Sequence, residues 1–546
     1  RGERQPSERL IGYLTSCDGA RATISTKASS LAESSSDFWS IGRLISINTG
    51  TARIVGLVYA MRTPSGEWQE DEQNVILVDV ELVGEITDRK NGGVEFTRGI
   101  GTYPCLGAVA HRIRGADLEA VHDLGGRGGV EIGTLSQDDS IKATVCIEDM
   151  LKRHFAVLGT TGVGKSSAVT MLVRKAVQER PKLRVMILDP HNEYARAFPE
   201  NSITLDARTL ELPFWMFRYD ELADVVFRGR EGLDEEADIL RELIPLARSR
   251  FQTGQMGSSQ NTLLKRPLDS GKFTADSPAP YRMSDLLSLL EDAMGKLDPR
   301  HQRHHMRALK GRLESLIYDP RFQFMFGKTA IEDNLDQIIG HIFRVPHAHR
   351  PITVFQLGGL PSEVTNAVAS IMSRLAFDIA MHSDGQYEIL LMCEEAHRYV
   401  PQDSNMGFAP TRLSIAKIAK EGRKYGCYLG IVTQRPGELD PTILSQCSTV
   451  FAMRLANDKD QEIIRSAIAD SSASTITFLS SIGNREAIAF GEAVATTMRM
   501  RFAYQERHQL PQAFGDDFEN MPTAPVDLNI GNIIGRMRML ANGEGR

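Results

Sequence analysis

The sequence predicts an α/β protein built on a parallel sheet, with a small β-barrel before this core and a helical insertion within it. Short apolar strands alternate with helical segments at 141–210 and 350–505, and such alternation is typical of parallel α/β sheets. Short runs rich in Val, Ile and Thr fill residues 1–140, which indicates a barrel or a sandwich. Strand patterns stop at 211–349, and residues 506–546 form a Pro-containing tail.

The N-terminal region is divided into short strands by glycine and aspartate. Cys17-Asp18-Gly19 and Asn91-Gly92-Gly93 are turn signals, and Gly125–Gly129 is a linker signal. We expect strands at Ala22–Ser25, Leu44–Ile47, Ala52–Tyr59, Asn74–Val83 and Val94–Thr97. Their number and spacing favour a small closed or sandwiched sheet.

The core is expected to begin with a short apolar strand, a Gly-rich loop and an amphipathic helix, at Phe155–Leu158 and Ser166–Glu179. Further core strands are expected at Arg184–Leu188, Ile352–Leu357, Glu388–Cys393, Tyr428–Val432 and Thr496–Ala503. Within the insertion, the stretches with helical spacing are Glu221–Arg250 and Met306–Tyr318, broken by a polar loop at Thr253–Asn261.

Length and composition limit the classes of protein to which the chain can belong. At 546 residues the chain is expected to form two to four structural units, and 42% hydrophobic with 24% charged residues indicates a globular protein. No apolar run approaches the roughly 18–20 residues that span a bilayer, and Arg1–Leu10 is polar, so we expect a cytoplasmic chain without a membrane segment. The first residue is not Met, which predicts that the native N-terminus is missing. Six scattered cysteines argue against a disulfide framework or a zinc site.

The Gly-rich loop fits the phosphate-binding pattern G-x-x-x-x-G-K-[ST] completely. It reads Gly159-Thr160-Thr161-Gly162-Val163-Gly164-Lys165-Ser166 and lies between an apolar strand and a helix. Its backbone N–H groups and the helix N-terminus bind phosphate oxygens. Lys165 is expected to reach the β- and γ-phosphates of ATP, and the Ser166 hydroxyl to ligate Mg²⁺. The predicted nucleotide-binding set extends from Gly159 through Ser167.

Two carboxylates end the strand Glu388–Cys393. We assign Glu394 to Mg²⁺, held through water, and Glu395 to the general base that deprotonates the attacking water. Taken alone, such a pair is more often a helix cap or a solvated strand end, and the phosphate motif tips the balance toward the catalytic interpretation. The generic motif has Asp at the first position, so the longer Glu394 weakens the metal assignment. His397 either relays the state of the γ-phosphate or packs beside the site.

Polar residues also end the strand Tyr428–Val432. Gln434 is expected to touch the γ-phosphate or the attacking water, with a capping role as the alternative. No further cation is evident on the side of the phosphate loop. Arg423, at a basic helix end, is therefore the expected finger that completes a neighbouring subunit's site, with Arg454 in reserve. The alternative for Arg423 is a cation that interacts with the helix dipole.

These motifs together resemble the HerA branch of the HerA/FtsK ATPases. The resemblance is carried by the phosphate loop and by four short motifs: Asp189-Pro-His-Asn-Glu193-Tyr194, Glu394-Glu-Ala-His397, Glu421-Gly-Arg-Lys424 and Thr433-Gln-Arg-Pro436. The barrel and the stretch Arg312–Phe326 also resemble HerA proteins, whereas the chain after about residue 505 does so weakly. Asn192 departs from the family, which usually has Gly there. The resemblance implies a RecA-like core in a homohexameric ring that moves double-stranded DNA through its channel.

The resemblance leaves two functions open. The first is a DNA translocase or helicase-like motor that works with a partner nuclease. The second is a hexameric scaffold that controls an antiphage-defence effector, such as a sirtuin-like NAD hydrolase or a nuclease. Intact Lys165, Glu395 and Gln434 argue against an inert scaffold, although a defence ATPase would also keep them. A conjugation or secretion ATPase fits less well, because the membrane segments and large N-terminal domains of that class are not seen.

The DNA-binding surface has the weakest signal. The net charge of −7 argues against a chain that coats DNA through overall basicity, and no zinc finger or helix-turn-helix is evident. Loops repeated around a ring need few basic residues per chain, and the loop Asp403–Thr411 before Arg412 is the candidate. The basic run His301–Arg312 is better explained as a solvated helix face.

Overall fold

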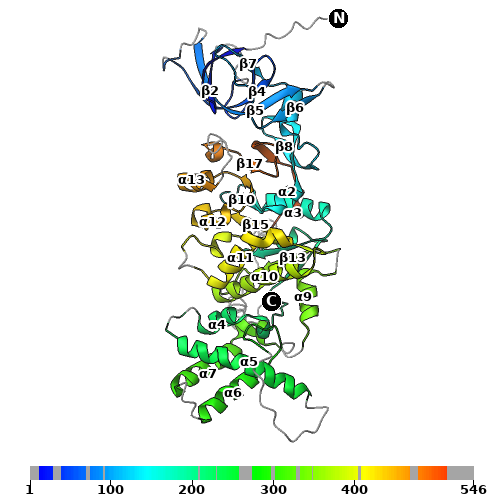
Figure 1. Cartoon of the computed structure of the whole chain (residues 1–546), viewed down its shortest axis with the longest axis vertical. Coiled ribbons are helices and arrows are strands. Elements are labelled where there is room, and N and C mark those ends of the chain that lie inside the picture. The colour runs from blue at the N-terminus through cyan, green and yellow to red at the C-terminus, as the bar shows by residue number, and fades with distance from the viewer. Residues whose placement is uncertain are drawn as a thin grey trace, which may run out of the picture.

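The computed structural model describes residues 11–28, 39–64, 66–68, 74–89, 93–206, 209–228, 230, 232–256, 273–296, 302–327, 333–346, 349–403, 407–467 and 477–512. Three parts are stacked along the long axis of the molecule (Figure 1). The barrel lies at one end, the sheet with its covering helices in the middle, and the helical insertion at the other end. The predicted fold class, a parallel α/β core with a barrel before it and an insertion within it, is confirmed.

The N-terminal part is a closed barrel of six strands. The order β2-β1-β7-β3-β4-β5 is closed by pairing of β2 with β5, and β6 extends the sheet beyond β5. The strands are β1 (Gly12–Cys17), β2 (Arg21–Ala28), β3 (Leu44–Asn48), β4 (Arg53–Arg62), β5 (Asn74–Asp88), β6 (Val94–Thr97) and β7 (Val109–Arg112). Closure removes the free sheet edges that would otherwise pair with other chains. The sequence pattern did not predict β1 and β7.

The second sheet has eleven strands, in the order β12-β13-β11-β14-β15-β10-β16-β17-β18-β8-β9. The pairs from β12 to β16 are parallel, and those from β16 to β9 are antiparallel. The parallel strands are β10 (Phe155–Leu158), β11 (Leu183–Asp189), β12 (Ser202–Leu205), β13 (Ile352–Gln356), β14 (Glu388–Glu394), β15 (Cys427–Thr433) and β16 (Thr449–Ala452). The antiparallel strands are β8 (Val130–Leu135), β9 (Asp138–Val145), β17 (Glu486–Gly491) and β18 (Met498–Phe502).

The hairpin of β8 and β9 belongs to this larger sheet. Its first strand pairs with β18, so the segment that follows the barrel joins the far edge of the core. The sequence-based boundary at residue 140 falls inside β9. We therefore propose that the barrel ends after β7 and that the core begins with β8.

Helices cover both faces of the parallel strands, because successive side chains of a strand point to opposite faces. Phe155 and Val157 of β10 belong to the apolar cluster that contains the inward side of α3 (Lys165–Glu179). Ala156 and Leu158 belong to the opposite cluster, which contains α10 (Ser362–His382) and the insertion. All four side chains are fully buried. Packing on both faces therefore fixes β10, and with it the starting point of the loop that follows Leu158.

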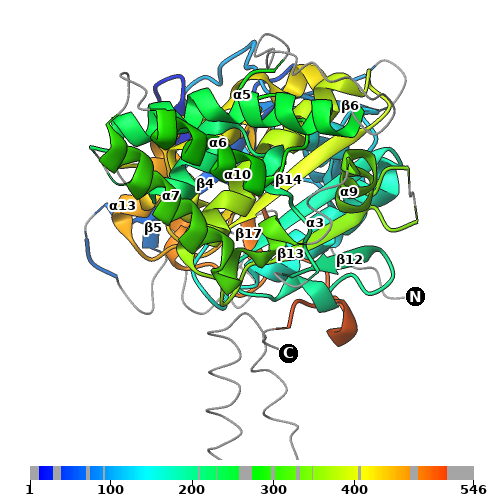
Figure 2. The same ribbon diagram turned by 90° about the horizontal axis from the view of Figure 1, so that it is seen from below.

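The remaining helices flank the core or form the insertion. The core helices are α1 (Gly115–His122), α2 (Ile147–Lys152), α11 (Ala409–Glu421), α12 (Pro441–Leu444) and α13 (Asp458–Ala467). The insertion contains α4 (Tyr219–Phe227), α5 (Asp234–Met256), α6 (Met283–Lys296), α7 (Arg303–Ile317), α8 (Gln323–Phe326) and α9 (Leu335–Phe343). Seen from below, α5, α6 and α7 lie in front of the core (Figure 2). Among the described residues, no helix combines the length and apolar character needed to cross a membrane.

Candidate nucleotide site

The parallel strands of the core end at one edge of the sheet. Leu158, the last residue of β10, pairs with Thr433 of β15 on one side and with Ala452 of β16 on the other. Beyond β15, β14 ends at Glu394, and beyond β14, β11 ends at Asp189. Since the carboxyl ends of parallel strands share an edge, the segments that follow these strands meet there.

The loop 159–166 is held between the two neighbouring strands. The Gly159 N–H donates to the Thr433 carbonyl oxygen at 3.3 Å, and the Thr160 N–H donates to the Arg454 carbonyl oxygen at 3.0 Å. These bonds continue the ladder of the sheet into the loop. The loop position is therefore set by β15 and β16 as much as by its own strand.

Glycines shape the inside of the loop. Gly162 has φ +79° and Gly164 has φ +101°, which is the left-handed region that glycine adopts without steric cost. A Cβ at Gly162 would meet open space, so an anion can approach the backbone there. The helix α3 begins at Lys165, and no side chain caps its N-terminus. Its first N–H groups and its positive dipole end are therefore available to phosphate.

Lys165 points into a group of acidic side chains. Its Nζ donates to the Thr160 carbonyl oxygen at 3.1 Å, and the residue is 8% exposed. Burial lowers the pKa of Lys165, and the charges of Glu394, Glu395 and Glu193 oppose this fall. Among the described residues, Lys165 forms no ion pair at contact distance with any of these acids, so its charge is available to a phosphate.

Ser166 and Glu394 are linked through the segment that follows β11. The Ser166 hydroxyl donates to Glu193 Oε2 at 3.1 Å. The Tyr194 hydroxyl donates to Glu394 Oε2 at 2.8 Å, and the Tyr194 N–H donates to Asp189 Oδ2 at 2.9 Å. Burial raises the pKa of Glu394 to about 8, and the charge of Glu395 adds to this rise. A bound cation would favour the ionised carboxylate.

Glu395 sits in a strained backbone conformation. Its φ is +51°, a region that costs a residue with a side chain about 1–3 kcal/mol. The side chain is buried, and one oxygen, Oε2, lies 3.3 Å from His397 Nδ1. The other, Oε1, lies 3.7 Å from His191 Nε2. His397 Nδ1 is also 2.9 Å from Thr433 Oγ1, so this ring connects the carboxylate to the end of β15. Burial lowers the pKa of His397.

Gln434 contacts the phosphate loop through its side chain. It follows β15, and its side-chain Oε1 accepts a hydrogen bond from the Thr161 hydroxyl. Both residues are accessible at this edge. The Gln434 side chain is therefore held against the phosphate loop.

The residues present fit ATP with Mg²⁺. The loop offers open backbone donors and Lys165, and the carboxylates of Glu193, Glu394 and Glu395 lie close enough to interact with this lysine. Magnesium typically takes one or two carboxylates together with phosphate oxygens, and no group of three His, Cys, Asp or Glu ligands occurs in the described parts of the chain. When bound, the ion neutralises charge on the phosphates.

On this geometry we propose roles for five residues. Lys165 holds the phosphates, and Ser166 with Glu394 holds the metal. Glu395 takes the proton of the attacking water, since its oxygen Oε2 is buried and accepts no hydrogen bond from the described residues. Gln434 orients the water or touches the γ-phosphate. The carboxylates of Glu394 and Glu395 lie close enough to Lys165 to interact with its charge before the substrate binds.

Three arginines occupy different places relative to this edge. Arg423 lies on a short 3₁₀ segment (Gly422–Tyr425) before β15, at the opposite edge of the sheet. The seven residues of β15 separate it from Gln434 by about 20 Å. Arg454 follows β16, next to its own phosphate loop, and donates to Asn484 Oδ1 at 2.9 Å. Arg485 also lies beside the loop, because its N–H donates to the Val163 carbonyl oxygen. The expectation that this side holds no further cation is therefore wrong.

Several contacts of the site were not predicted. Glu193 and Tyr194 were recognised as part of a family motif, but their bonds to Ser166 and Glu394 were not anticipated. Two polar residues a short distance after a buried strand are the signal that could have found them. Arg485 has no such signal, since it comes 327 residues after Leu158 and its position depends on the antiparallel strands.

Asn192 is tolerated for a physical reason. Its φ is +58°, and asparagine adopts this left-handed region more readily than most residues. Its side-chain Oδ1 also accepts from the Gly358 N–H at 2.9 Å, which ties the segment to the loop after β13. The departure from the family's usual glycine thus leaves the backbone path intact.

Two other sequence-based candidates lie away from the site. In the loop Asp403–Thr411, residues 404–406 lie outside the described residues, so the DNA-contact hypothesis stays a prediction. In the basic run His301–Arg312, His305 lies 2.9 Å from Glu235 and 3.0 Å from Glu236 of α5. That part of α7 is thus engaged in packing the insertion.

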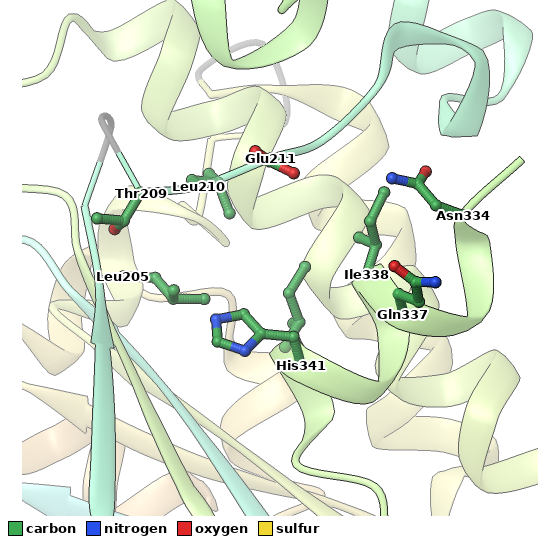
Figure 3. A pocket seen from close by; sticks show the side chains of 9 residues that line it. Leu205, Thr209, Leu210, Glu211, Asn334, Gln337, Ile338 and His341 are labelled. Carbon is green, nitrogen blue, oxygen red and sulfur yellow. The ribbon is translucent and has the colours of Figure 1, made fainter. Parts of the chain in front are cut away.

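A separate cavity of about 330 Å³ lies between the segment after β12 and α9. Figure 3 shows Asn334, Gln337 and His341 of this helical segment facing Leu205 and Glu211 across the space. No residue of the phosphate loop or of the carboxylate pair lines it. The cavity is not part of the nucleotide site.

Comparisons with known proteins agree with the motifs. The family model described as "Helicase HerA, central domain" matches residues 130–376. The DNA double-strand break repair helicase HerA of Pyrococcus furiosus is 25% identical over 445 residues, covering 77% of this chain and 79% of that protein. A probable helicase of Methanocaldococcus jannaschii is 24% identical, covering 78% of this chain and 76% of that protein. These matches confirm the predicted resemblance.

VirB4 of Thermoanaerobacter pseudethanolicus superposes with a TM-score of 0.48 and 16% identity, covering 71% of this chain and 99% of that chain.

Replacing Lys165 by Ala should lower ATP turnover by about 10²–10³-fold, because the variant loses the charge that faces the phosphates. The fold should persist, since the hydrogen bond that Nζ makes in the described part of the chain goes to the Thr160 carbonyl oxygen of the same loop. Steady-state ATPase assays and thermal unfolding measure both quantities. Lys175→Ala, on the same helix, is the matched control and should keep normal turnover. Near-normal turnover of Lys165→Ala would remove the phosphate assignment.

Replacing Glu395 by Gln should leave ATP bound but lower its hydrolysis by about 10²–10⁴-fold, because the amide cannot accept the proton of water. The matched variant Glu394→Gln should instead weaken the Mg²⁺ dependence of binding. Nucleotide binding and single-turnover hydrolysis, measured over a Mg²⁺ titration, separate the two effects. Normal hydrolysis by Glu395→Gln together with lost hydrolysis by Glu394→Gln would show that the roles are reversed.

Proposed function

Because this chain is a HerA-type P-loop ATPase of the HerA/FtsK superfamily, we propose that it is a ring motor that uses ATP to translocate on or unwind double-stranded DNA. The proposed ring is a homohexamer, and its proposed partner is a nuclease or an NAD-hydrolysing effector protein in the cytoplasm. Support for a DNA motor comes from relatives named as DNA double-strand break repair helicases, which match over most of their length.

The observation that supports assembly into a ring is the position of Arg423. This residue is exposed on the short segment before β15, about 20 Å from its own Gln434. Arg423 has no ion-pair partner among the described residues. A cation in this place cannot serve the phosphates of its own chain, but a neighbouring chain can receive it. Such a finger stabilises the charge that develops on the transferred phosphoryl group.

A ring also explains how an acidic chain could hold DNA. The net charge of −7 opposes binding over the outer surface. Six copies around a channel multiply a few cationic side chains into a ring of phosphate contacts. The interaction would be insensitive to sequence, since phosphate contacts carry no sequence information directly.

The alternative is a hexameric scaffold that assembles and regulates an antiphage-defence effector. It requires the same intact ATP site, so the geometry at the phosphate loop does not separate the two functions. What separates them is the ligand that controls turnover: DNA for the motor, and the effector protein for the scaffold.

For the motor, double-stranded DNA should raise ATP turnover several-fold, with a midpoint concentration that increases steeply with salt because bound counterions are released. The measurement is steady-state ATPase activity against duplex concentration at several salt concentrations, with Glu395→Gln as the inactive control. Turnover that ignores duplex DNA and responds only to a copurifying protein would favour the scaffold over the motor.

If Arg423 acts in trans, Arg423→Ala protomers should bind ATP, but their turnover of ATP should fall by about 10³-fold or more. Mixing them with Lys165→Ala protomers should restore part of the activity, since one subunit supplies the finger and its neighbour the intact loop. Mixed-variant assays with mass measurement of the assembly test this, and Lys424→Ala is the matched neighbour. A fully active monomer, or an Arg423→Ala variant with unchanged turnover, contradicts the mechanism. The second result alone would move the finger to Arg454.

A further inference from the structure

We propose that a pocket beside the phosphate loop, bounded by Arg485 and Tyr504, binds the base of the nucleotide. The ligand class is a nucleobase attached to the phosphates that Lys165 holds. The inference deepens the ATPase assignment and is independent of whether the motor acts on DNA. None of the sequence motifs includes these two residues.

The pocket begins where the phosphate loop ends. Its volume is about 130 Å³, and its walls include Gly164, Ser167 and Ala168 at the start of α3. Lys165 serves the β- and γ-phosphates at the other side of the loop. The remainder of a nucleotide, the ribose and base, must therefore leave the loop past the first turn of α3. The pocket occupies that exit.

The far wall of the pocket comes from the end of the described chain. Phe502 of β18, Tyr504 and Leu510 line it together with Arg485. Phe502 is 4% exposed, whereas Tyr504 is 79% exposed. An apolar lining with a few polar groups is typical of small-ligand sites. An exposed aromatic ring beside a phosphate loop offers a face on which a base can stack.

Arg485 makes the second half of the proposed clamp. Its guanidinium carbon lies 5.6 Å from the centroid of the Tyr504 ring, which is cation–π distance. No acidic side chain pairs with this guanidinium in the described residues. A planar guanidinium stacks on aromatic faces and on bases alike. Arg485 and Tyr504 therefore present two flat groups at the same opening.

The backbone fixes Arg485 relative to the phosphate loop. Its N–H donates to the Val163 carbonyl oxygen at 2.9 Å, and its carbonyl oxygen accepts from the Phe502 N–H at 2.9 Å. Its φ is +61°, in the left-handed region. A Cβ at Gly164 would lie 3.5 Å from Arg485 Cγ, so the arginine stem already packs on the loop.

The residue after Arg485 anchors this corner. Glu486 accepts from Arg499 at 2.8 Å, from Arg501 at 2.9 Å and from the Gly483 N–H at 3.0 Å. Burial opposes ionisation of this carboxyl, but these hydrogen bonds outweigh it and lower the pKa of Glu486 to about 2. These hydrogen bonds tie the backbone beside Arg485 to β18 and to Gly483.

The segment from Tyr504 onward is tied to the nucleotide site at two further points. The Gln505 side-chain amide donates to the Ser167 carbonyl oxygen at 2.8 Å. The Gln512 N–H donates to the Glu193 carbonyl oxygen at 3.1 Å. Glu193 is the residue that accepts from the Ser166 hydroxyl. The segment thus runs from the proposed base pocket to the proposed metal side of the loop.

The test compares a ligand that has a base with one that lacks it. Binding of ADP and of pyrophosphate, both with Mg²⁺, is measured by calorimetry for the whole chain and for Tyr504→Ala, Tyr504→Phe and Tyr318→Ala. Tyr318 is 80% exposed at the end of α7 and is the control matched in chemistry and exposure. Tyr504 is equally exposed, so its truncation should not unfold the chain.

Tyr504→Ala should weaken ADP binding about tenfold or more, the fold-change expected for loss of one base–aromatic stack. Pyrophosphate affinity should not change, and Tyr504→Phe should retain ADP affinity within about twofold, because the ring remains. Unchanged ADP affinity in Tyr504→Ala would overturn the proposal, and so would an equal loss for ADP and pyrophosphate. An unmodified chain that binds neither ligand would overturn the phosphate-loop assignment, and this proposal with it.

Arg485→Ala separates the two halves of the clamp. A loss for ADP alone supports contact with the base. An equal loss for pyrophosphate would place Arg485 on the phosphates and overturn its role in the clamp. Stimulation by DNA is measured in parallel, so that failure of the motor proposal remains distinguishable from failure of the base pocket.

Discussion

The parallel register of β11, β14, β15, β10 and β16 is the constraint on which the rest of the site depends. It ends these strands at one edge, so that Asp189, Glu394, Thr433 and Leu158 come from distant parts of the chain to one place. The hydrogen bonds from Gly159 to Thr433 and from Thr160 to Arg454 then extend the sheet into the phosphate loop. A shift of any one strand by a residue would turn its side chains to the other face and would misplace the polar residue that follows it.

The same edge gathers charge in an unbalanced way. Glu193, Glu394 and Glu395 lie close enough to the buried Lys165 to interact with its charge, and burial raises the pKa values of Asp189 and Glu394 while it lowers that of Lys165. Such opposed shifts are typical of sites that bind or transform charged ligands. The left-handed backbone of Glu395 stores strain at the residue proposed as the base. A phosphate chain with a divalent cation would compensate both the lysine and the acids.

The sequence was sufficient wherever one local pattern determines the structure. The phosphate loop, the apolar strand β10 and the carboxylates at the end of β14 each follow from a short run of residues, and the barrel and the insertion follow from spacing and composition. What could not be predicted depends on contacts between distant segments. The bond from Ser166 to Glu193 requires two strands to be neighbours in space. The placing of Arg485 against Val163 requires β17 and β18 to fold back beside β10. The hairpin of β8 and β9 carries the strand pattern of the barrel, but it pairs with β18 in the core.

The central claim is that ATP binds at this edge with its phosphates on Gly159–Ser166 and its γ-phosphate facing Glu395. The most direct measurement is an experimental structure of the Glu395→Gln chain with ATP and Mg²⁺. We expect phosphates within hydrogen-bond distance of Lys165, the metal on Ser166, and the side chain at position 395 facing the γ-phosphate. Phosphates bound elsewhere, or a γ-phosphate remote from position 395 with the loop empty, would contradict it.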